Sequence, residues 1–226
     1  MHHSWPLFDL VIRTPRLEIR LARESEFEDL VAVIEGGIHD PASMPFTHPW
    51  TDDPPPQRNR DSYQWWWRQR ADWSRDKWSF DGSVYLDGRV IGVQQLMATQ
   101  FAELGTVSSG SWLGLAHQGQ GYGKEMRAGI LHLAFAGLGA QEAYSGAFTD
   151  NHSSRGTSRS LGYEENGSDL KLRRGQPHRM VNFRLDRSSW AAQARPDCTL
   201  EGLEGCLDMF GAPFVARQDT DDSGGL

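Results

Sequence analysis

Apolar and polar positions repeat with two different periods along the first third of the chain. Residues 17–21 alternate between the two kinds, which is the period of a half-buried strand. Over residues 24–38 the apolar side chains recur every three or four positions, and this spacing predicts an amphipathic helix that ends at a Gly-Gly pair. A second helix is expected over residues 58–73, with these aromatic residues on one side: Tyr63, Trp66, Trp67 and Trp73.

The middle of the chain predicts strands joined by tight turns. An Asp87-Gly88 pair separates two β-rich runs, 83–86 and 89–97, and such a pair is a strong hairpin signal. The later elements are expected in the order strand 107–115, helix 121–138, strand 143–148, helix 151–161, and a hairpin of strands 168–173 and 180–185 around Gly175-Gln176-Pro177. This order predicts a mixed, mostly antiparallel twisted sheet flanked by helices, in the α+β class.

Composition narrows the class of protein. The 226 residues are 38% apolar and 11% aromatic, which is too rich for a disordered chain. With 23 basic and 30 acidic residues the net charge is −7, which argues against nucleic acid or an anionic membrane as partner. No apolar run approaches the ~20 residues of a membrane span, and the N-terminus lacks the pattern of a signal peptide, so we expect a cytoplasmic protein.

The two cysteines, Cys198 and Cys206, are too few for a disulfide framework or a zinc constellation. We expect two reduced thiols and no bound metal.

The segment that points most clearly to a ligand site is a strand followed by a glycine-rich turn. A helix begins directly after this turn. Residues 110–125 read GSWLGLAHQGQGYGKE. The first N–H groups of a helix have no intrahelical partner, and the helix dipole adds about half a positive charge there. Three glycines (119, 121 and 123) remove Cβ atoms that would block a phosphate. The segment predicts an anion site suited to a pyrophosphate, and a plain glycine-rich helix cap is the simpler interpretation.

Two familiar phosphate-binding motifs do not fit this segment. A Walker A loop needs Gly at the position of Gln118, and Ser or Thr where Glu125 stands. The dinucleotide fingerprint needs its third Gly one position after Gly123, and an N-terminal βαβ unit that the predicted order lacks.

Three motifs in matching order resemble the GNAT superfamily of N-acetyltransferases. Gln118-x-x-Gly121-x-Gly123 resembles the acyl-CoA pyrophosphate loop of that family. Residues 12–20 (IRTPRLEIR) and 151–163 (Asn-x-x-Ser, then Leu-Gly-Tyr) resemble segments of the branch of ribosomal-protein N-terminal acetyltransferases. The resemblance covers about residues 10 to 187. Shorter segments resemble actinobacterial members described as succinyl-CoA transferases: 5–10, 39–41, 44–46 and 110–115.

The resemblance implies a GNAT acyl-CoA N-acyltransferase fold, with acetyl-CoA or succinyl-CoA as cosubstrate and a role for each motif. The strand before the loop would splay from its neighbour, and a backbone N–H at Trp112 or Leu113 would bind the thioester oxygen. Asn151 would cap its helix and bind the pantetheine amide. Ser154 would protonate the departing thiolate, and Ser158 stands where many members carry a Tyr. The implied catalytic residues are Ser154 and Leu113, and the implied CoA-binding residues are Trp112, Leu113, Leu115, Gln118, Gly119, Gln120, Gly121, Tyr122, Gly123, Lys124, Asn151 and Ser154.

A long proline-rich loop over residues 39–56 is expected to form the wall on the acceptor side. The residues expected to bind substrate are His39, Met44, Phe46 and Gln94. The general base stays open among His39, His48, Glu103 and His117. The amine acceptor also stays open between a protein N-terminus, a lysine and a small amine.

The expected organisation is an acyltransferase domain over 1–187, an appendage over 188–216 that packs on the domain or a dimer partner, and a disordered tail over 217–226. Leu203, Leu207 and Phe210 have the spacing of a short amphipathic helix in the appendage. The expected function is acyl transfer to a primary amine by direct attack in a ternary complex, in a homodimer or higher oligomer. A non-catalytic acyl-CoA sensor or assembly protein and a generic phosphate-binding module are the alternatives.

Overall fold

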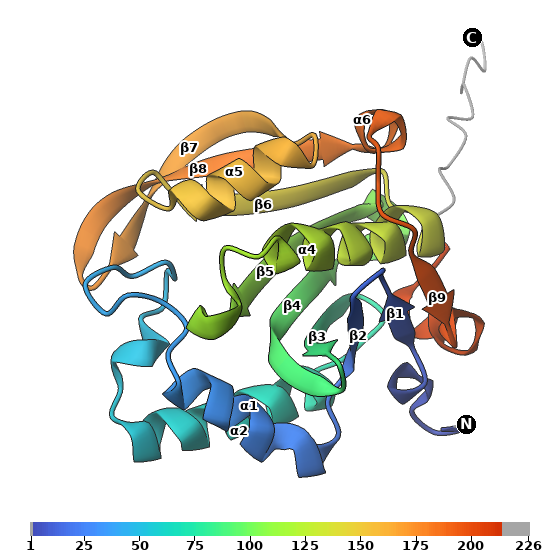
Figure 1. Ribbon diagram of the computed structural model, residues 1–226. Coiled ribbons are helices and arrows are strands. Elements are labelled where there is room, and N and C mark those ends of the chain that lie inside the picture. Colours follow the sequence, from blue (N-terminus) through green and yellow to red (C-terminus); the bar gives the residue numbers. More distant parts are fainter. Residues whose placement is uncertain (1, 214–226) are drawn as a thin grey trace, which may run out of the picture.

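A nine-stranded sheet with helices on both faces forms the centre of the protein (Figure 1). The computed structural model describes residues 2–213. The strands lie in the order β7-β8-β6-β5-β4-β3-β2-β1-β9, and every neighbouring pair is antiparallel except β5 and β6. The strands are β1 (Val11–Arg13), β2 (Leu17–Leu21), β3 (Lys77–Leu86), β4 (Arg89–Thr99), β5 (Thr106–Leu113), β6 (Glu142–Phe148), β7 (Glu164–Arg173), β8 (Gln176–Asp186) and β9 (Thr199–Glu201).

The helices are α1 (Phe27–Glu35), α2 (Pro55–Ala71), α3 (Phe101–Leu104), α4 (Tyr122–His132), α5 (His152–Ser160) and α6 (Arg187–Ala192). A π-helical turn, Leu133–Gly137, extends α4, and a 3-10 helix, Leu203–Phe210, follows β9. The mixed sheet of the α+β class is confirmed. The elements that the pattern did not predict, β1, α3, α6 and β9, have three to six residues, too few to display a period.

Several predicted boundaries differ from the structure. Strand β3 begins at Lys77, six residues before the predicted start at 83, and β7 begins at Glu164, four residues before the predicted start at 168. The turn of the second hairpin is formed by Arg174 and Gly175, both with positive φ, so Gln176 and Pro177 belong to β8. Helix α2 ends at Ala71, which leaves Trp73 beyond it. Trp73 packs instead on Phe210 near the C-terminal end of the described chain, a partner that no local pattern reveals.

Each face of the sheet has its own hydrophobic core. The larger core lies under α4, where the alternation of β2 buries Leu17, Ile19 and Leu21. The smaller core lies on the opposite face, where α1 and α2 cover the sheet with Phe27 and Trp66. The sheet therefore separates two helical layers.

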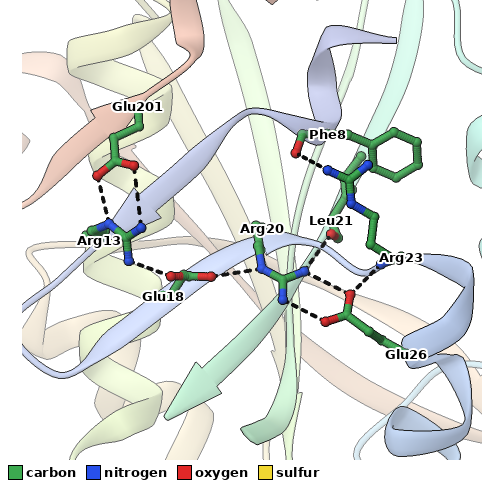
Figure 2. Close-up of polar contacts among 8 residues, drawn as sticks. All are labelled: Phe8, Arg13, Glu18, Arg20, Leu21, Arg23, Glu26 and Glu201. Atoms are coloured by element: carbon green, nitrogen blue, oxygen red, sulfur yellow. Dashed lines mark hydrogen bonds and ion pairs between the residues drawn. The ribbon is translucent and has the colours of Figure 1, made fainter. Parts of the chain in front are cut away.

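The C-terminal segment closes the far edge of the sheet. Strand β9 pairs with β1, and a Cβ at Gly202 would lie only 2.2 Å from the carbonyl oxygen of Asp9, so a glycine is required there. A chain of ion pairs runs from β9 across β1 and β2 to the start of α1 (Figure 2), through Glu201, Arg13, Glu18, Arg20 and Glu26. Exposed pairs of this kind contribute little stability, about 0–1 kcal/mol each, but they fix the relative position of these elements.

The proposed disorder of residues 217–226 lies outside the described residues. Within residues 2–213, no helix is both long enough and apolar enough to cross a bilayer. The two cysteines are free thiols, and burial raises the pKa of Cys206 to about 12.

Candidate functional site

The ladder between β5 and β6 stops halfway along both strands. Three pairs join them, from Thr106–Glu142 to Ser108–Tyr144, and none of the later residues of these two strands, all of them described, pairs across this boundary. Strand β6 stays paired with β8 up to Phe148, and β5 stays paired with β4 up to Leu113. The two strands therefore diverge, and one edge of residues 109–113 is left open.

One hydrogen bond at the end of β5 shows toward which neighbouring strand each backbone N–H of β5 points. The N–H of Gly114 donates to the carbonyl oxygen of Ile91 on β4, 2.9 Å away. Peptide groups alternate in direction along a strand, so the N–H groups of Leu113 and Ser111 point to the opposite side, toward the gap. Of the two N–H groups suggested by the sequence, that of Leu113 faces the gap and that of Trp112 faces β4.

The glycine-rich loop leaves the start of α4 open. Gly119 and Gly121 have φ values of 72° and 84°, which glycine adopts without strain. A Cβ at Gly119 would meet no atom within 4 Å, so its surroundings are free space. Gly121 is the N-cap of α4, and no side chain caps the first N–H groups of that helix. An anion can therefore approach these N–H groups directly, as a pyrophosphate requires.

Two side chains hold this loop in place. The Nε2 of Gln118 donates to the carbonyl oxygens of Leu113 and Ile38, at 2.8 and 2.9 Å. Arg16 donates to the carbonyl oxygen of Gln120, pairs with Glu125 and lies over the ring of Tyr122. The side chain of Gln118 thus supports the loop, which leaves its backbone groups for a ligand.

A cleft of about 1260 Å³ passes along the loop and through the gap between β5 and β6. It exceeds the roughly 300–1000 Å³ of a typical small-molecule site. Most of the predicted site residues line it: His39, Met44, Phe46, Trp112, Leu113, Leu115, Gln118, Gly119, Gly121, Gly123, Lys124, Asn151 and Ser154. Tertiary structure therefore brings the glycine-rich loop, the segment from Asn151 to Ser154 and the loop over residues 39–56 to one cavity, whereas the motif over residues 12–20 does not line it.

Three predicted residues do not line the cleft. Gln94 is fully buried, and its Nε2 donates to the carbonyl oxygens of Gln95 and Gly110, so it does not face an acyl group there. The next residue, Gln95, points to the other face and lines the cleft. The side chain of Gln120 donates to the carbonyl oxygen of Ala116, and that of Tyr122 lies under Arg16.

Helix α5 brings two serines to different environments. Asn151 caps this helix, because its Oδ1 accepts the N–H of Ser154 at 3.1 Å, and both residues line the cleft. Ser158, one turn later, is fully buried and accepts a hydrogen bond from Arg127 at 2.9 Å. Of the two serines considered as an acid, only Ser154 borders the cleft.

Arg127 is a cleft residue that sequence reasoning missed. It lies on the buried face of α4 and is only 5% exposed. Nη1 donates to the Oγ of Ser158 and Nη2 to the Oγ of Ser111, while the buried Nε has no partner. Burial lowers the pKa of this guanidinium, which nevertheless stays charged in proteins. The available signal was a charged residue on a helix face that is otherwise apolar at Ile130 and Ala134.

On the acceptor side, the turn of the β7–β8 hairpin holds the loop that precedes α2. Arg173 donates to the carbonyl oxygen of Met44 and pairs with Asp150 at 2.8 Å, and Arg174 pairs with Asp52 at 2.7 Å. Figure 1 shows the curled end of this hairpin beside the loop. The wall of the cleft is therefore built from segments more than a hundred residues apart in the sequence.

Two of the four candidates for the general base line the cleft, and two do not. His39 and His48 line the cleft, whereas Glu103 on α3 and His117 do not. His39 is held by Thr51, whose Oγ1 lies 2.7 Å from its Nε2. Asp150 also lines the cleft, but the hydrogen bond from Arg173 keeps its pKa below the usual 3.8, which makes it a weak base. Within residues 2–213 there is no cluster of three His, Cys, Asp or Glu side chains that could hold a metal.

Comparisons with known proteins agree with this fold. Solved structures with the same fold include Mycobacterium smegmatis RimJ in complex with CoA-disulfide, at 17% identity over 95% of this chain and 100% of that one, with a TM-score of 0.67. RimL, a ribosomal L7/L12 alpha-N-protein acetyltransferase in complex with coenzyme A, matches at 16% identity over 79% and 99%, with a TM-score of 0.63. A putative ribosomal-protein-serine acetyltransferase from Vibrio cholerae matches at 21% identity over 78% and 97%, with a TM-score of 0.60.

At these identities the structures establish the fold alone. The family itself is shown by the sequence, because the acetyltransferase (GNAT) domain model matches residues 16–164. The chain therefore belongs to the GNAT family of acetyltransferases.

Proposed function

We propose that the protein is an N-acyltransferase that moves an acetyl or succinyl group from CoA to a primary amine by direct attack in a ternary complex. The observation that carries this proposal is the divergence of β5 from β6 beside the uncapped start of α4. A pyrophosphate on the loop and a thioester in the gap would then belong to one extended ligand. The amine would approach from the side of the loop around His39 and Phe46.

Leu113 would stabilise the charge that develops on the thioester oxygen. Its N–H points toward the gap, and it is held there by the ladder with β4. A backbone N–H aimed at a developing oxyanion contributes about 3 kcal/mol to the transition state. The loop from Gln118 to Lys124 would fix the ligand through its backbone N–H groups, and Asn151 would bind the pantetheine amide.

Ser154 would donate the proton that the departing CoA sulfur accepts. The thiol leaves easily, because an unperturbed thiol has a pKa near 8.5. His39 and His48 are the two sequence-proposed bases that border the cleft, and either could take the proton of the attacking ammonium directly or through water. Because acyl-CoA is the donor, we place the reaction in the cytoplasm, and we expect a homodimer or higher oligomer.

The first experiment is calorimetric titration of the full chain with acetyl-CoA, succinyl-CoA, CoA and inorganic phosphate. Binding of the CoA species without binding of phosphate supports the proposed site. Gly121→Asp, which places a carboxylate against the pyrophosphate, should abolish CoA binding. Gly88→Asp is the matched control, because Gly88 also has positive φ, at 76°, but lies in the β3–β4 turn with no atom near its Cβ position. Equal CoA affinity in Gly121→Asp and Gly88→Asp would contradict the proposal.

A non-catalytic CoA sensor is the competing function, since this chain has Ser158 where many relatives carry Tyr. Release of free thiol from acetyl-CoA or succinyl-CoA separates the two functions. The acceptors to test are a peptide with a free N-terminus, a lysine peptide and a small polyamine. Tight binding of acyl-CoA with no thiol release from any of them would favour the sensor.

A further inference from the structure

Two residues of β3 hold the side-chain amide of Gln95 in one orientation. Its Nε2 donates to Oδ1 of Asp81 and, at 2.9 Å, to Oγ of Ser79. A carboxylate accepts hydrogen bonds and donates none, so the NH2 group of Gln95 faces Asp81 and the amide oxygen is turned away from it. Within residues 2–213, Oε1 of Gln95 accepts no hydrogen bond.

The carboxylate of Asp81 is itself held in place by two further donors. The indole N–H of Trp65 donates to its Oδ2 at 2.9 Å, and the hydroxyl of Ser79 donates to its Oδ1 at 3.1 Å. Burial raises the pKa of this carboxyl, whereas the hydrogen bonds from Gln95, Ser79 and Trp65 favour its charged form. Asp81 thus has a fixed position, and it fixes the amide of Gln95 in turn.

The free amide oxygen lies over the open part of β5. Asp81, Gln95 and Gly110 are register partners across β3, β4 and β5, so their side-chain positions share one face of the sheet. Gly110 has no side chain, and a Cβ added there would meet Oε1 of Gln95 at 3.4 Å. Both residues line the cleft. The absence of a side chain at Gly110 therefore leaves this oxygen open to the cleft.

This face of the sheet is the one that the amine is proposed to reach. Val93, two residues before Gln95 on β4, packs in the smaller core with α1 and α2. Trp112 is the register partner of Val93 and packs against the same core, and its ring lies 6.4 Å from that of Trp50 in the acceptor-side loop. Gln95 is therefore on the side of the acceptor wall, whereas α4 covers the opposite face.

We propose that Oε1 of Gln95 accepts a hydrogen bond from the attacking amine, and that Asp81 is a positioning residue that keeps this oxygen turned toward the cleft. This inference rests on the proposed function of the cleft. An amide oxygen accepts a hydrogen bond but is too weak a base to remove the proton, which still goes to a histidine or to water. The nitrogen lone pair stays free to form the bond to the thioester carbon as the bond from that carbon to sulfur breaks.

The distance from Leu113 to Gln95 leaves room for the reacting groups. Gly110, under the amide oxygen, is three residues before Leu113 on β5, which is about 10 Å along a strand. The thioester carbonyl and the amine would lie between the N–H of Leu113 and Oε1 of Gln95. Two hydrogen bonds of about 2.9 Å, a carbonyl bond of about 1.2 Å and an approach of about 3 Å between nitrogen and carbon cover a similar length.

The first test removes the amide. In Gln95→Met, kcat/KM for the amine should fall at least tenfold, while the affinity for acetyl-CoA and succinyl-CoA in calorimetric titrations changes less than twofold. Thiol release is measured with a peptide that has a free N-terminus, a lysine peptide and a small polyamine. Gln57→Met is the matched control, because Nε2 of Gln57 also donates to an aspartate, Asp61, at 2.8 Å, but Gln57 does not line the cleft.

Each outcome of this test is informative. An unchanged kcat/KM in a folded Gln95→Met protein would overturn the inference, and so would an equal fall in Gln57→Met or an equal loss of acyl-CoA affinity. Thiol release from none of the three amines in the wild type would instead refute the proposed function, and the inference with it.

The second test exchanges the two side chains. Asp81→Asn offers Gln95 an NH2 group as well as an oxygen, so the amide can turn over and withdraw its oxygen from the cleft. We expect kcat/KM for the amine to fall at least fivefold, again with acyl-CoA affinity unchanged. The double variant of Asp81→Asn with Gln95→Glu restores the pattern, since residue 81 then donates and residue 95 presents an acceptor oxygen to the cleft. Its kcat/KM should recover to at least a third of the wild-type value, and a double variant as weak as Gln95→Met would overturn the role of Asp81.

Discussion

The side-chain amide of Gln118 donates a hydrogen bond to the carbonyl oxygen of Leu113, 2.8 Å away. Its second hydrogen bond, to the carbonyl oxygen of Ile38, reaches the segment that follows α1. One side chain thus joins the glycine-rich loop to the end of β5 and to the acceptor-side wall. The glycine-rich loop and the N–H of Leu113 are therefore held at a fixed separation, as the ligand proposed to span both requires.

Gln118→Ala should weaken CoA binding because the loop loses both of these hydrogen bonds. Each contributes about 1 kcal/mol, so the dissociation constant should rise by up to about 30-fold. Calorimetric titration with CoA measures the change. Gln141→Ala is the control, since the Nε2 of Gln141 also donates to a carbonyl oxygen, that of Gly139, outside the cleft. An unchanged affinity in Gln118→Ala would show that the loop keeps its shape without this side chain.

Ser154→Ala should reduce kcat about tenfold near pH 7, less than the roughly 100- to 10,000-fold typical of acid catalysis by a single side chain, because a thiol leaves easily. The defect should shrink above the pKa of the CoA thiol, near 8.5, because the thiolate then leaves without a proton. Steady-state rates of thiol release across pH 6.5–9.5 measure both effects. Ser160→Ala, on the exposed side of the same helix, serves as the control. A defect in Ser154→Ala that is independent of pH would argue against a role as acid.

The pair of Asp150 and Arg173 should stabilise the protein in a pH-dependent way. The hydrogen bond from Arg173 lowers the pKa of Asp150 in the folded state. A lowered pKa gives stabilisation that is fully present above the unfolded-state value of about 3.9 and is lost as the pH falls through the folded-state pKa. The difference in unfolding free energy between the wild type and Asp150→Asn should therefore be largest near pH 6 and decline below pH 4. Urea denaturation at several pH values measures it, and a difference that grows on acidification would refute this account.

Phe210→Ala should destabilise the whole protein, because we propose that the C-terminal segment is part of the folded domain. Phe210 is fully buried against Trp73 and Trp78, and its carbonyl oxygen accepts a hydrogen bond from the Trp78 indole at 3.0 Å. Loss of a buried phenylalanine costs about 3–5 kcal/mol, which corresponds to a fall in Tm of roughly 10 °C for a chain of this size. Leu172→Ala, at a position 68% exposed, should leave Tm nearly unchanged. A small shift in Phe210→Ala would mean that this segment is energetically separate from the domain.

Much of the fold followed from local pattern. The alternation over residues 17–21, the Asp87-Gly88 turn and the apolar stripe of the fourth helix each depend on near neighbours in the chain, and each was predicted within a few residues of its actual bounds. The short strand β9 pairs only with β1, almost 190 residues earlier, so no window of sequence could reveal it. The position of Trp73 was missed for the same reason.

The sequence by itself determined the α+β class, the glycine-rich loop before the fourth helix and the family, because backbone preference, the absence of Cβ atoms and motif order are local properties. Tertiary structure decided that β5 and β6 part after Ser108, that Ser154 borders the cleft while Ser158 is buried, and that Gln94 turns away from it. It also decided that Arg127 lies in the wall of the cleft without a counter-charge. Burial and the partners of a charge arise from contacts between distant segments, and these exist only once the chain is folded.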